Sequence, residues 1–466
     1  MIEDKHPEPA HGTAAKQHAD SQSGSSMTPK RWERAKNLFE MAQELGPRER
    51  ASFLNQACPD DPALCDEVES LLAGDRRAGD FLEKPILADA APTESGPAPA
   101  GTLSIGQVLS GRFRVIRFLA QGGMGEVYEA KDLDLGERVA LKTIRPEIAS
   151  EPHTMALFKQ EIQLARRVTH PNVCRMFDLE RYRPSPGTDP SAVEVTFLTM
   201  ELLEGETLAA RLGRVGRMTT AEALPLVQQM AEALGAAHDV GVVHLDFKPG
   251  NVMLVSSKSS EGKERAVVTD FGLAKALAAT DQAAGEGPAF SVTASGHMLG
   301  TIAYMAPEQL QGHEATPATD LYALGLVMYE MVTGKRPFPG ELHGVLERTK
   351  EPPPPPRVHV PDLDLRWESA ILRCLVRDPA SRFATARDVT RALELAPGDA
   401  ETLFNAAHVY NQLGDGDQAL FWLEKALAAG WPVTDARDSP YFESLRLDPR
   451  FQRLFQNTSK PQGGRA

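Results

Sequence analysis

Hydrophobic positions change their spacing along the chain, and these changes predict the order of its secondary structure. Hydrophobic and polar residues alternate in FRVIRFLA, GEVYEAKD and RVALKTI, between Phe113 and Ile144, which predicts an antiparallel sheet. From Thr219 onward, hydrophobic residues recur every three or four positions in AEALPLVQQMAEALGAAHDVG, DLYALGLVMYEMVTG and RWESAILRCLVRD, and this spacing predicts helices. A strand-rich part followed by a helix-rich part indicates a bilobal α+β domain, which we expect over residues 111–395.

Small all-α segments are expected on both sides of this domain. Helical spacing between residues 28 and 75 predicts a small helical bundle, after a polar and disordered segment at 1–27. Residues 76–110 are assigned to a linker because Ala, Pro, Gly and Ser dominate its second half.

A helical tail is expected over residues 396–466. Its hydrophobic positions follow the helix-turn-helix spacing of a tetratricopeptide repeat; they are Leu403, Ala406, Ala407, Tyr410, Ala419, Leu423 and Ala426. One repeat cannot bury both of its faces, so either the following SPYFESLRLDPRFQRLF or the large domain must cover it. Packing and the docking of a protein partner are both open as roles for the tail.

Composition and charge narrow the classes of function. The 466 residues are 42% hydrophobic, which supports a real core, and the formal net charge of −14 argues against a nucleic-acid partner. The four cysteines form no CxxC pair, so reduced thiols are favoured over a disulfide framework or a zinc site. No hydrophobic run is long enough for a membrane span, and the first twenty residues lack the apolar segment of a secretion signal. We therefore expect a cytoplasmic protein.

The proline run Pro352–Pro356 has two interpretations. It matches a polyproline ligand for an SH3-type domain, but it also suits a stiff connector at the surface. The connector is favoured because helical segments flank the run on both sides.

A glycine-rich segment, LAQGGMGEVYEA, lies between two predicted strands. Gly122, Gly123 and Gly125 would let backbone amides close over phosphate groups without interference from side chains. Glycine turns between strands are common, so this segment alone indicates little. Ala120 occupies the first position of the G-x-G-x-x-G pattern.

Charged residues in three further motifs add to this signal. Lys142 follows hydrophobic residues in a predicted strand, where a buried ammonium group requires an anion, and Glu161 in a predicted helix is a suitable partner. Asp246 in HLDFKPGN can accept a hydroxyl proton, while Asn251 and Asp270 provide oxygen atoms of the kind that Mg²⁺ prefers.

Taken in this order, the motifs resemble those of eukaryotic-type serine/threonine protein kinases, specifically the bacterial branch, from about Phe113 to Leu395. The resemblance implies a bilobal protein-kinase fold, ATP and Mg²⁺ as cofactors, and protein substrates with Ser or Thr hydroxyls. It implies nucleotide contacts from Ala120, Gly122, Gly123, Gly125, Val127, Ala140, Lys142, Glu161, Glu201, Leu203, Asn251 and Asp270.

The same resemblance implies individual roles. Lys142 would hold the α and β phosphates and pair with Glu161, and Asp246 would be the catalytic base. Lys248 would steady the γ-phosphate, and Asn251 and Asp270 would bind the metal. Further expected features are a pair between Glu308 and Arg382 and a helix with Asp320 and Gly325 that supports the catalytic loop.

Two alternative classes compete with a protein kinase. Small-molecule kinases such as aminoglycoside phosphotransferases share the catalytic loop but lack the A-P-E segment, which is present here at Ala306–Glu308. A scaffold pseudokinase would have lost Lys142, Asp246, Asn251 or Asp270, and none of them is lost.

Leu245 stands where the common kinase pattern has Arg before the catalytic Asp. That Arg faces the activation segment, and phosphorylation there neutralises its charge and orders the loop. An apolar residue removes this cation, so we predict a non-RD kinase whose activity depends only modestly on loop phosphorylation. Candidate autophosphorylation sites are Ser291, Thr293, Ser295 and Thr301.

Overall fold

The computed structural model describes residues 102–122, 125–183, 194–256, 264–271, 302–338, 348–396 and 398–456, together with Leu38 and Val68. The chain forms two compact units, Met1–Arg76 and Arg77–Ala466. In the first unit Leu38 and Val68 are helical and buried. The rest of the bundle predicted at 28–75, the segment 1–27 and the candidate phosphorylation sites all lie outside the described residues.

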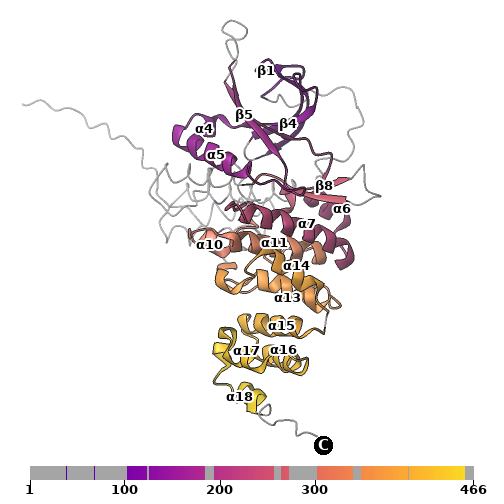
Figure 1. Cartoon of the computed structure of the whole chain (residues 1–466), viewed down its shortest axis with the longest axis vertical. Coiled ribbons are helices and arrows are strands. Elements are labelled where there is room, and N and C mark those ends of the chain that lie inside the picture. Colours follow the sequence, from indigo (N-terminus) through magenta and orange to yellow (C-terminus); the bar gives the residue numbers. More distant parts are fainter. Residues whose placement is uncertain are drawn as a thin grey trace, which may run out of the picture. The chain divides into compact units, whose positions relative to one another are not determined.

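The second unit begins with an antiparallel sheet of six strands in the order β1-β2-β3-β4-β6-β5, as predicted (Figure 1). The strands are β1 (Val108–Leu109), β2 (Phe113–Gly122), β3 (Gly125–Asp132), β4 (Arg138–Ile144), β5 (Met176–Tyr182) and β6 (Val195–Glu201). Neighbouring residues of β6 face opposite sides of the sheet: Phe197 joins a cluster with Phe113 and Tyr128, whereas Leu198 packs with Phe158 of helix α5. The helices beside the sheet are α4 (Pro146–Ala149) and α5 (Pro152–Ala165).

The linker predicted at 76–110 ends earlier than expected. Residues 108 and 109 form β1, which pairs with β2. Leu103 and Leu109 are buried in the cluster of the sheet, and the Leu103 N–H donates to Tyr128 Oη at 3.1 Å. The segment from 102 to 110 therefore belongs to the domain, because its two leucines cover the end of the sheet, which composition alone did not reveal.

A helical layer with a second sheet follows. Strands β7 (Gly205–Thr207), β8 (Val252–Ser256) and β9 (Glu264–Val268) form this sheet. The helices are α6 (Leu208–Val215), α7 (Thr220–His238), α10 (Pro307–Leu310), α11 (Pro317–Thr333), α13 (Leu365–Cys374) and α14 (Ala386–Glu394), with short 3-10 turns η1 (Pro249–Asn251), η2 (Pro356–Val358) and η3 (Pro379–Ser381).

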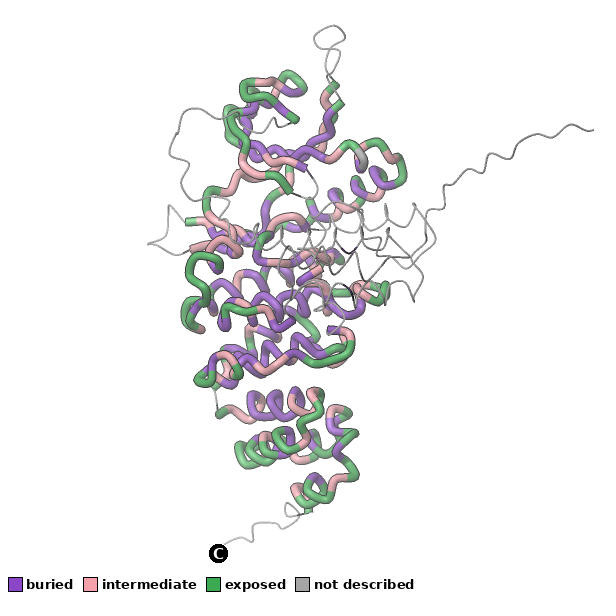
Figure 2. Tube along the Cα trace, turned by 180° about the vertical axis from the view of Figure 1, so that it is seen from behind, coloured by how far each residue is buried: buried purple, intermediate pink, exposed green. Residues whose placement is uncertain are grey.

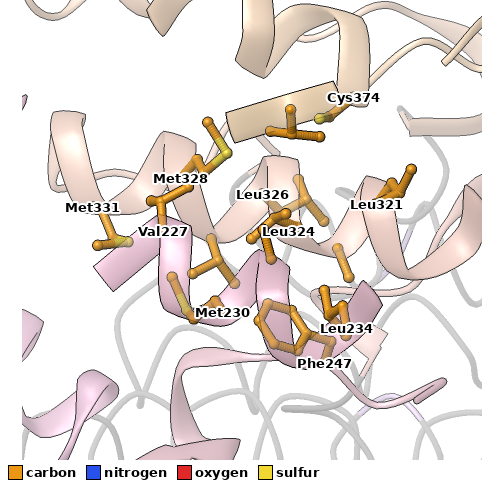
Figure 3. Packing of buried hydrophobic residues seen from close by; sticks show 14 of the residues in the cluster. Val227, Met230, Leu234, Phe247, Leu321, Leu324, Leu326, Met328, Met331 and Cys374 are labelled. Atoms are coloured by element: carbon orange, nitrogen blue, oxygen red, sulfur yellow. The ribbon is translucent and has the colours of Figure 1, made fainter. Parts of the chain in front are cut away.

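Helix α11 is almost entirely buried at the centre of this layer. Figure 3 shows Leu324, Leu326 and Met328 of α11 packed between Val227 and Met230 of α7 and Cys374 of α13. Gly325 is required at this crossing, because an added Cβ atom would lie 2.6 Å from the Cys374 Cβ atom. Figure 2 shows many buried positions, in purple, in the helices of this layer, with intermediate and exposed positions between them.

The tail consists of α15 (Ala400–Gln412), α16 (Gly416–Ala428), α17 (Val433–Asp438), the 3-10 segment η4 (Pro440–Leu445) and α18 (Pro449–Gln456). The predicted helix-turn-helix is present, and its small residues Ala406, Ala407, Ala419 and Ala426 are fully buried. The repeat is covered both by the segment that follows it and by the large domain. Phe442 and Phe451 of the following segment join the tail cluster, and so does Leu365 of α13 (Figure 1).

Two further expectations concern the proline run and the membrane. Pro353 and Pro356 are buried, so the run packs against the domain, which supports the connector interpretation. Among the helices of the described residues, none has both the length and the apolar character needed to cross a bilayer.

Candidate functional site

The glycine-rich segment is a hairpin that joins β2 to β3. Ala120 pairs with Val127, and Gly122 pairs with Gly125; Gly123 lies outside the described residues. Gly125 has a φ of 151°, and a Cβ atom there would lie 1.9 Å from the Thr143 carbonyl oxygen of β4. Only glycine allows this approach of two backbones, so the hairpin is held close to the strand that carries Lys142.

Lys142 lies at the centre of the sheet, opposite Val127 on one side and Leu198 on the other. Its side chain is 7% exposed, and its Nζ lies 2.7 Å from Asp270 Oδ1. Burial opposes ionisation of Asp270, but the Lys142 ammonium outweighs it and lowers the pKa of that carboxyl group. The buried ammonium group of Lys142 thus faces the partly buried carboxylate of Asp270.

This contact differs from the expected pairing of Lys142 with Glu161. Glu161 lies on α5, half-buried, while the ion pair of Lys142 found among the described residues is with Asp270. Asp270 itself has a φ of 62°, an uncommon conformation for a residue with a side chain.

The residues expected around the adenine ring are adjacent in the sheet. Ala140 is buried and pairs with Met200, and Val139 pairs with Glu201. The Glu201 carboxylate accepts a hydrogen bond from Arg265 Nη2 at 3.1 Å. Leu203 follows two residues after β6 and is half-buried. Met200 and Glu201 therefore lie opposite Ala140 and Val139 in the sheet.

The carboxylate of Asp246 is held by two neighbours from its own loop. Lys248 Nζ lies 3.0 Å from Oδ1 and 2.8 Å from Oδ2. Asn251 Nδ2 donates to Oδ2 at 3.1 Å and to the Asp246 carbonyl oxygen at 2.8 Å. Because Asn251 uses its amide nitrogen here, its Oδ1 is the atom it can offer to a cation.

The backbone before Asp246 is strained, and a carboxylate on helix α11 holds it by hydrogen bonds. Leu245 has a φ of 68°, which costs a residue with a side chain about 1–2 kcal/mol. The buried carboxylate of Asp320, on α11, accepts the N–H groups of His244 at 2.8 Å and Leu245 at 2.9 Å. The expected support of the loop by Asp320 is confirmed.

His244 connects the two acidic loops of the site. Its Nε2 lies 2.9 Å from the carbonyl oxygen of Thr269, the residue before Asp270. The Thr269 N–H also donates to the Asn251 carbonyl oxygen at 2.9 Å. These contacts bring Asp270 to the loop of Asp246 and Asn251, and the charges of both Lys142 and Lys248 lower the pKa of Asp270.

The pair between Glu308 and Arg382 is also confirmed. Arg382 Nη1 and Nη2 lie 2.7 and 2.8 Å from the two carboxylate oxygens, and both side chains are buried. Thr319 Oγ1 donates to Glu308 Oε1 at 3.0 Å. Burial opposes ionisation of Glu308, but Arg382 more than compensates, so the pKa of Glu308 lies below its usual value.

Two residues near the site escaped sequence reasoning. Arg348 is 1% exposed and donates to the carbonyl oxygens of Ile302, Ala303 and Met305. The Gln309 side chain accepts from the Ala306 N–H at 3.0 Å and donates to the Leu245 carbonyl oxygen at 3.1 Å. Gln309 carries a local signal, because Gln at the third position of a helix is typical of a capping box; Arg348 carries none.

The donor set fits a magnesium ion that shares its ligands with phosphate groups. Asn251 and Asp270 supply one amide oxygen and one carboxylate, and Mg²⁺ commonly takes one or two protein oxygens and completes its shell with water and substrate phosphates. In the described part of the chain, no three His, Cys, Asp or Glu side chains gather to form a metal site by themselves. The site is thus suited to a metal that arrives with a phosphorylated ligand.

Several bacterial protein kinases are similar to this chain in sequence. The serine/threonine-protein kinase PknA of Mycobacterium tuberculosis is 39% identical over 306 residues, which are 64% of this chain and 65% of PknA. The serine/threonine-protein kinase pkn3 of Myxococcus xanthus is 32% identical over 340 residues, which are 72% of this chain and 58% of pkn3. The chain spans less than two thirds of the length of these curated relatives.

Among solved structures, the crystal structure of the Mycobacterium tuberculosis PknI kinase domain is similar at 25% identity and a TM-score of 0.47, covering 62% of this chain and 98% of that domain. The model of the protein kinase domain family matches residues 113–392. This range is more than half of the chain and contains all the site residues described above, so the chain belongs to the protein kinase domain family.

Proposed function

We propose that this chain is a cytoplasmic serine/threonine kinase that transfers the γ-phosphoryl group of ATP to protein hydroxyls, including its own, in bacterial signal transduction. The observation that carries the proposal is the arrangement of Lys142 beside Asp270 and of Asp246 beside Lys248 and Asn251. Two ammonium groups and three oxygen-bearing side chains are the groups that the binding of a metal-bound triphosphate requires, which supports the proposal.

Each side chain has a distinct role in this proposal. Asp246 accepts the proton of the attacking hydroxyl, and its carboxylate is held in place by Lys248 and Asn251. Lys142 holds the α and β phosphates, and Lys248 balances charge on the transferred group. Asn251 and Asp270 provide the oxygen ligands for Mg²⁺, and Mg-ATP, when bound, supplies the phosphoryl group and the metal charge that stabilises its transfer.

Two features support a protein substrate over a small molecule. The A-P-E segment is present, and its Glu308 is fixed by a two-point ion pair with Arg382. Such an anchor holds a substrate-facing segment in a defined position, which a small hydroxylated substrate would not require. Lys248, two residues after Asp246, follows the Ser/Thr rather than the Tyr pattern.

We propose that the tail packs against the kinase domain and also binds a protein partner. One side of α15 is used against α13, where Tyr410 Oη donates to Glu368 at 2.7 Å. Repeat surfaces commonly bind proteins, so the helices α16 to α18 are proposed as the side for a partner. A pull-down with the full chain and with a chain that lacks residues 396–466, which removes α15 to α18, tests this, and equal recovery of partners would contradict docking.

The test of the proposed function is mass spectrometry of the purified full chain after incubation with Mg-ATP, together with transfer of labelled phosphate to a generic protein substrate. Lys142→Ala and Asp246→Asn should each reduce transfer by at least about a thousandfold. Lys131→Ala and Asp239→Asn make the same chemical changes at exposed positions and should retain activity. Transfer that persists in purified Asp246→Asn would remove that residue from the role of base. A wild-type chain that labels neither itself nor the generic substrate would refute the function.

A further inference from the structure

The peptide group between Leu245 and Asp246 is held at both of its polar atoms. Its carbonyl oxygen accepts a hydrogen bond from Gln309 Nε2 at 3.1 Å. Its N–H donates to His244 Nδ1 at 3.3 Å. Because a peptide group is planar, these two bonds fix the orientation of this plane and with it the position of the Asp246 Cα atom, from which the side chain leaves the backbone.

This support is needed because the residue before Asp246 is strained. Leu245 has a φ of 68°, and a residue with a side chain stays in this region only when its surroundings hold it there. Asp320 holds the Leu245 N–H at 2.9 Å, and Gln309 holds its carbonyl group. Without the bond from Gln309, rotation toward a relaxed backbone would turn the peptide group that positions Asp246.

The other end of the Gln309 side chain is attached to a different segment. Its Oε1 accepts the N–H of Ala306 at 3.0 Å, at the end of residues 302–306. Arg348 holds the carbonyl oxygens of this segment, and Glu308, next to Gln309, is fixed by Arg382. Gln309 therefore projects from an anchored helix and contacts both segment 302–306 and the loop of Asp246.

We propose that Gln309 is a positioning residue for phosphoryl transfer, whose side-chain amide couples the order of segment 302–306 to the orientation of Asp246. The proposal rests on the proposed role of Asp246 as proton acceptor. The Leu245 side chain has no charge through which the activation segment could act on this loop, and the neutral amide of Gln309 provides a connection that needs no phosphate group.

A conservative substitution distinguishes the two hydrogen bonds of the Gln309 side chain. Gln309→Glu keeps an oxygen that accepts the Ala306 N–H, but a carboxylate cannot donate to the Leu245 carbonyl oxygen. Gln311→Glu makes the same chemical change two residues later, at an exposed position, and is the matched control. Gln309→Ala removes both contacts and serves as the second variant if the carboxylate prevents folding.

The readout is the transfer rate per nucleotide-binding site, with the number of sites measured by titration with a fluorescent ATP analogue. Gln309→Glu should lower this rate about tenfold, which corresponds to about 1.4 kcal/mol, while Gln311→Glu should change it less than twofold. The KM for ATP should change little, because Lys142 and Asp270 are not touched. Hydrogen exchange should accelerate at the amides of 244–247 and stay constant in α11.

Three outcomes would overturn the coupling. Equal rates per site in Gln309→Glu and Gln311→Glu, with an active wild-type chain, would refute the positioning role and leave the proposed kinase function intact. A loss of binding sites with an unchanged rate per site would show that Gln309 serves folding alone. An inactive wild-type chain would refute both proposals together.

Discussion

Replacing Tyr410 by Phe removes a single hydroxyl group from the contact between α15 of the tail and α13 of the kinase domain. That hydroxyl donates to Glu368 Oε1 at 2.7 Å, and Glu368 is 0% exposed. The remaining contacts of the carboxylate are the Arg357 N–H at 3.1 Å and, at the limit of an ion pair, Arg357 Nε at 4.0 Å. The substitution therefore leaves a buried carboxylate with one strong hydrogen bond fewer.

The expected cost follows from these contacts. A hydrogen bond to a buried charged group contributes about 1.5–3 kcal/mol to the free energy of unfolding. For a unit of roughly 350 residues, the entropy of unfolding is about 0.7 kcal/mol/K, so a loss of about 2 kcal/mol lowers the melting temperature by about 3 °C.

The assay is scanning calorimetry of the full chain, supported by urea unfolding. Tyr441→Phe is the matched control, because the Tyr441 hydroxyl makes no hydrogen bond to any residue in the described part of the chain. In a Glu368→Gln background, Tyr410→Phe should lower the melting temperature by a smaller amount, since the charged acceptor is gone. We also expect the tail and the kinase domain to unfold in one shared transition, because Glu368 and Leu365 of α13 contact the tail.

Two results would refute this reasoning. If Tyr410→Phe shifted the melting temperature no more than Tyr441→Phe, the hydrogen bond to Glu368 would not attach the tail. If calorimetry showed two separate transitions and only the smaller one moved, the tail would fold without the kinase domain.

Dephosphorylation of the purified chain should lower its transfer rate less than about a hundredfold, or about 3 kcal/mol of barrier, in a labelled-ATP assay; a larger drop would contradict the non-RD prediction. Gly125→Ala should raise the KM for ATP at least about tenfold, because the new Cβ would meet the Thr143 carbonyl oxygen at 1.9 Å. Gly106→Ala, also at positive φ but with open space, is its control, and equal KM values would argue against the glycine hairpin. Glu308→Gln should reduce the free energy of unfolding by about 3 kcal/mol at pH 7. Because Arg382 holds the pKa of Glu308 below its usual value, this contribution exists above the unfolded pKa of about 4.3 and is lost as the pH falls below it. Urea unfolding should therefore show a smaller difference between the two proteins at pH 4 than at pH 7, and a constant difference would exclude the ion pair as the cause.

The sequence predicted the parts of the site that depend on local spacing. The strand period placed Lys142 in the sheet, and the glycines predicted a hairpin over the same face. The A-P-E segment and its distant Arg382 were found through the resemblance, and the structure confirms their pairing. These features are short motifs whose residue types are set by the chemistry they perform.

Contacts between distant segments could not be predicted in the same way. The sequence offered Glu161 as a partner for Lys142, whereas the ion pair seen in the described part of the chain joins Lys142 to Asp270, which is 128 residues away in the sequence. Nothing near Arg348 in the sequence indicates that its guanidinium binds carbonyl groups more than forty residues earlier. The contact of Tyr410 with Glu368 likewise depends on how the tail packs, because helical spacing defines a buried face but not its partner.

The strained backbone at Leu245 has a consequence for protein design. Its main-chain atoms are held by two hydrogen bonds: its N–H donates to Asp320, and its carbonyl oxygen accepts from Gln309. Exchange of this one residue should therefore leave the main-chain contacts of the loop in place. A designer could vary the charge of the side chain at this position without rebuilding the loop.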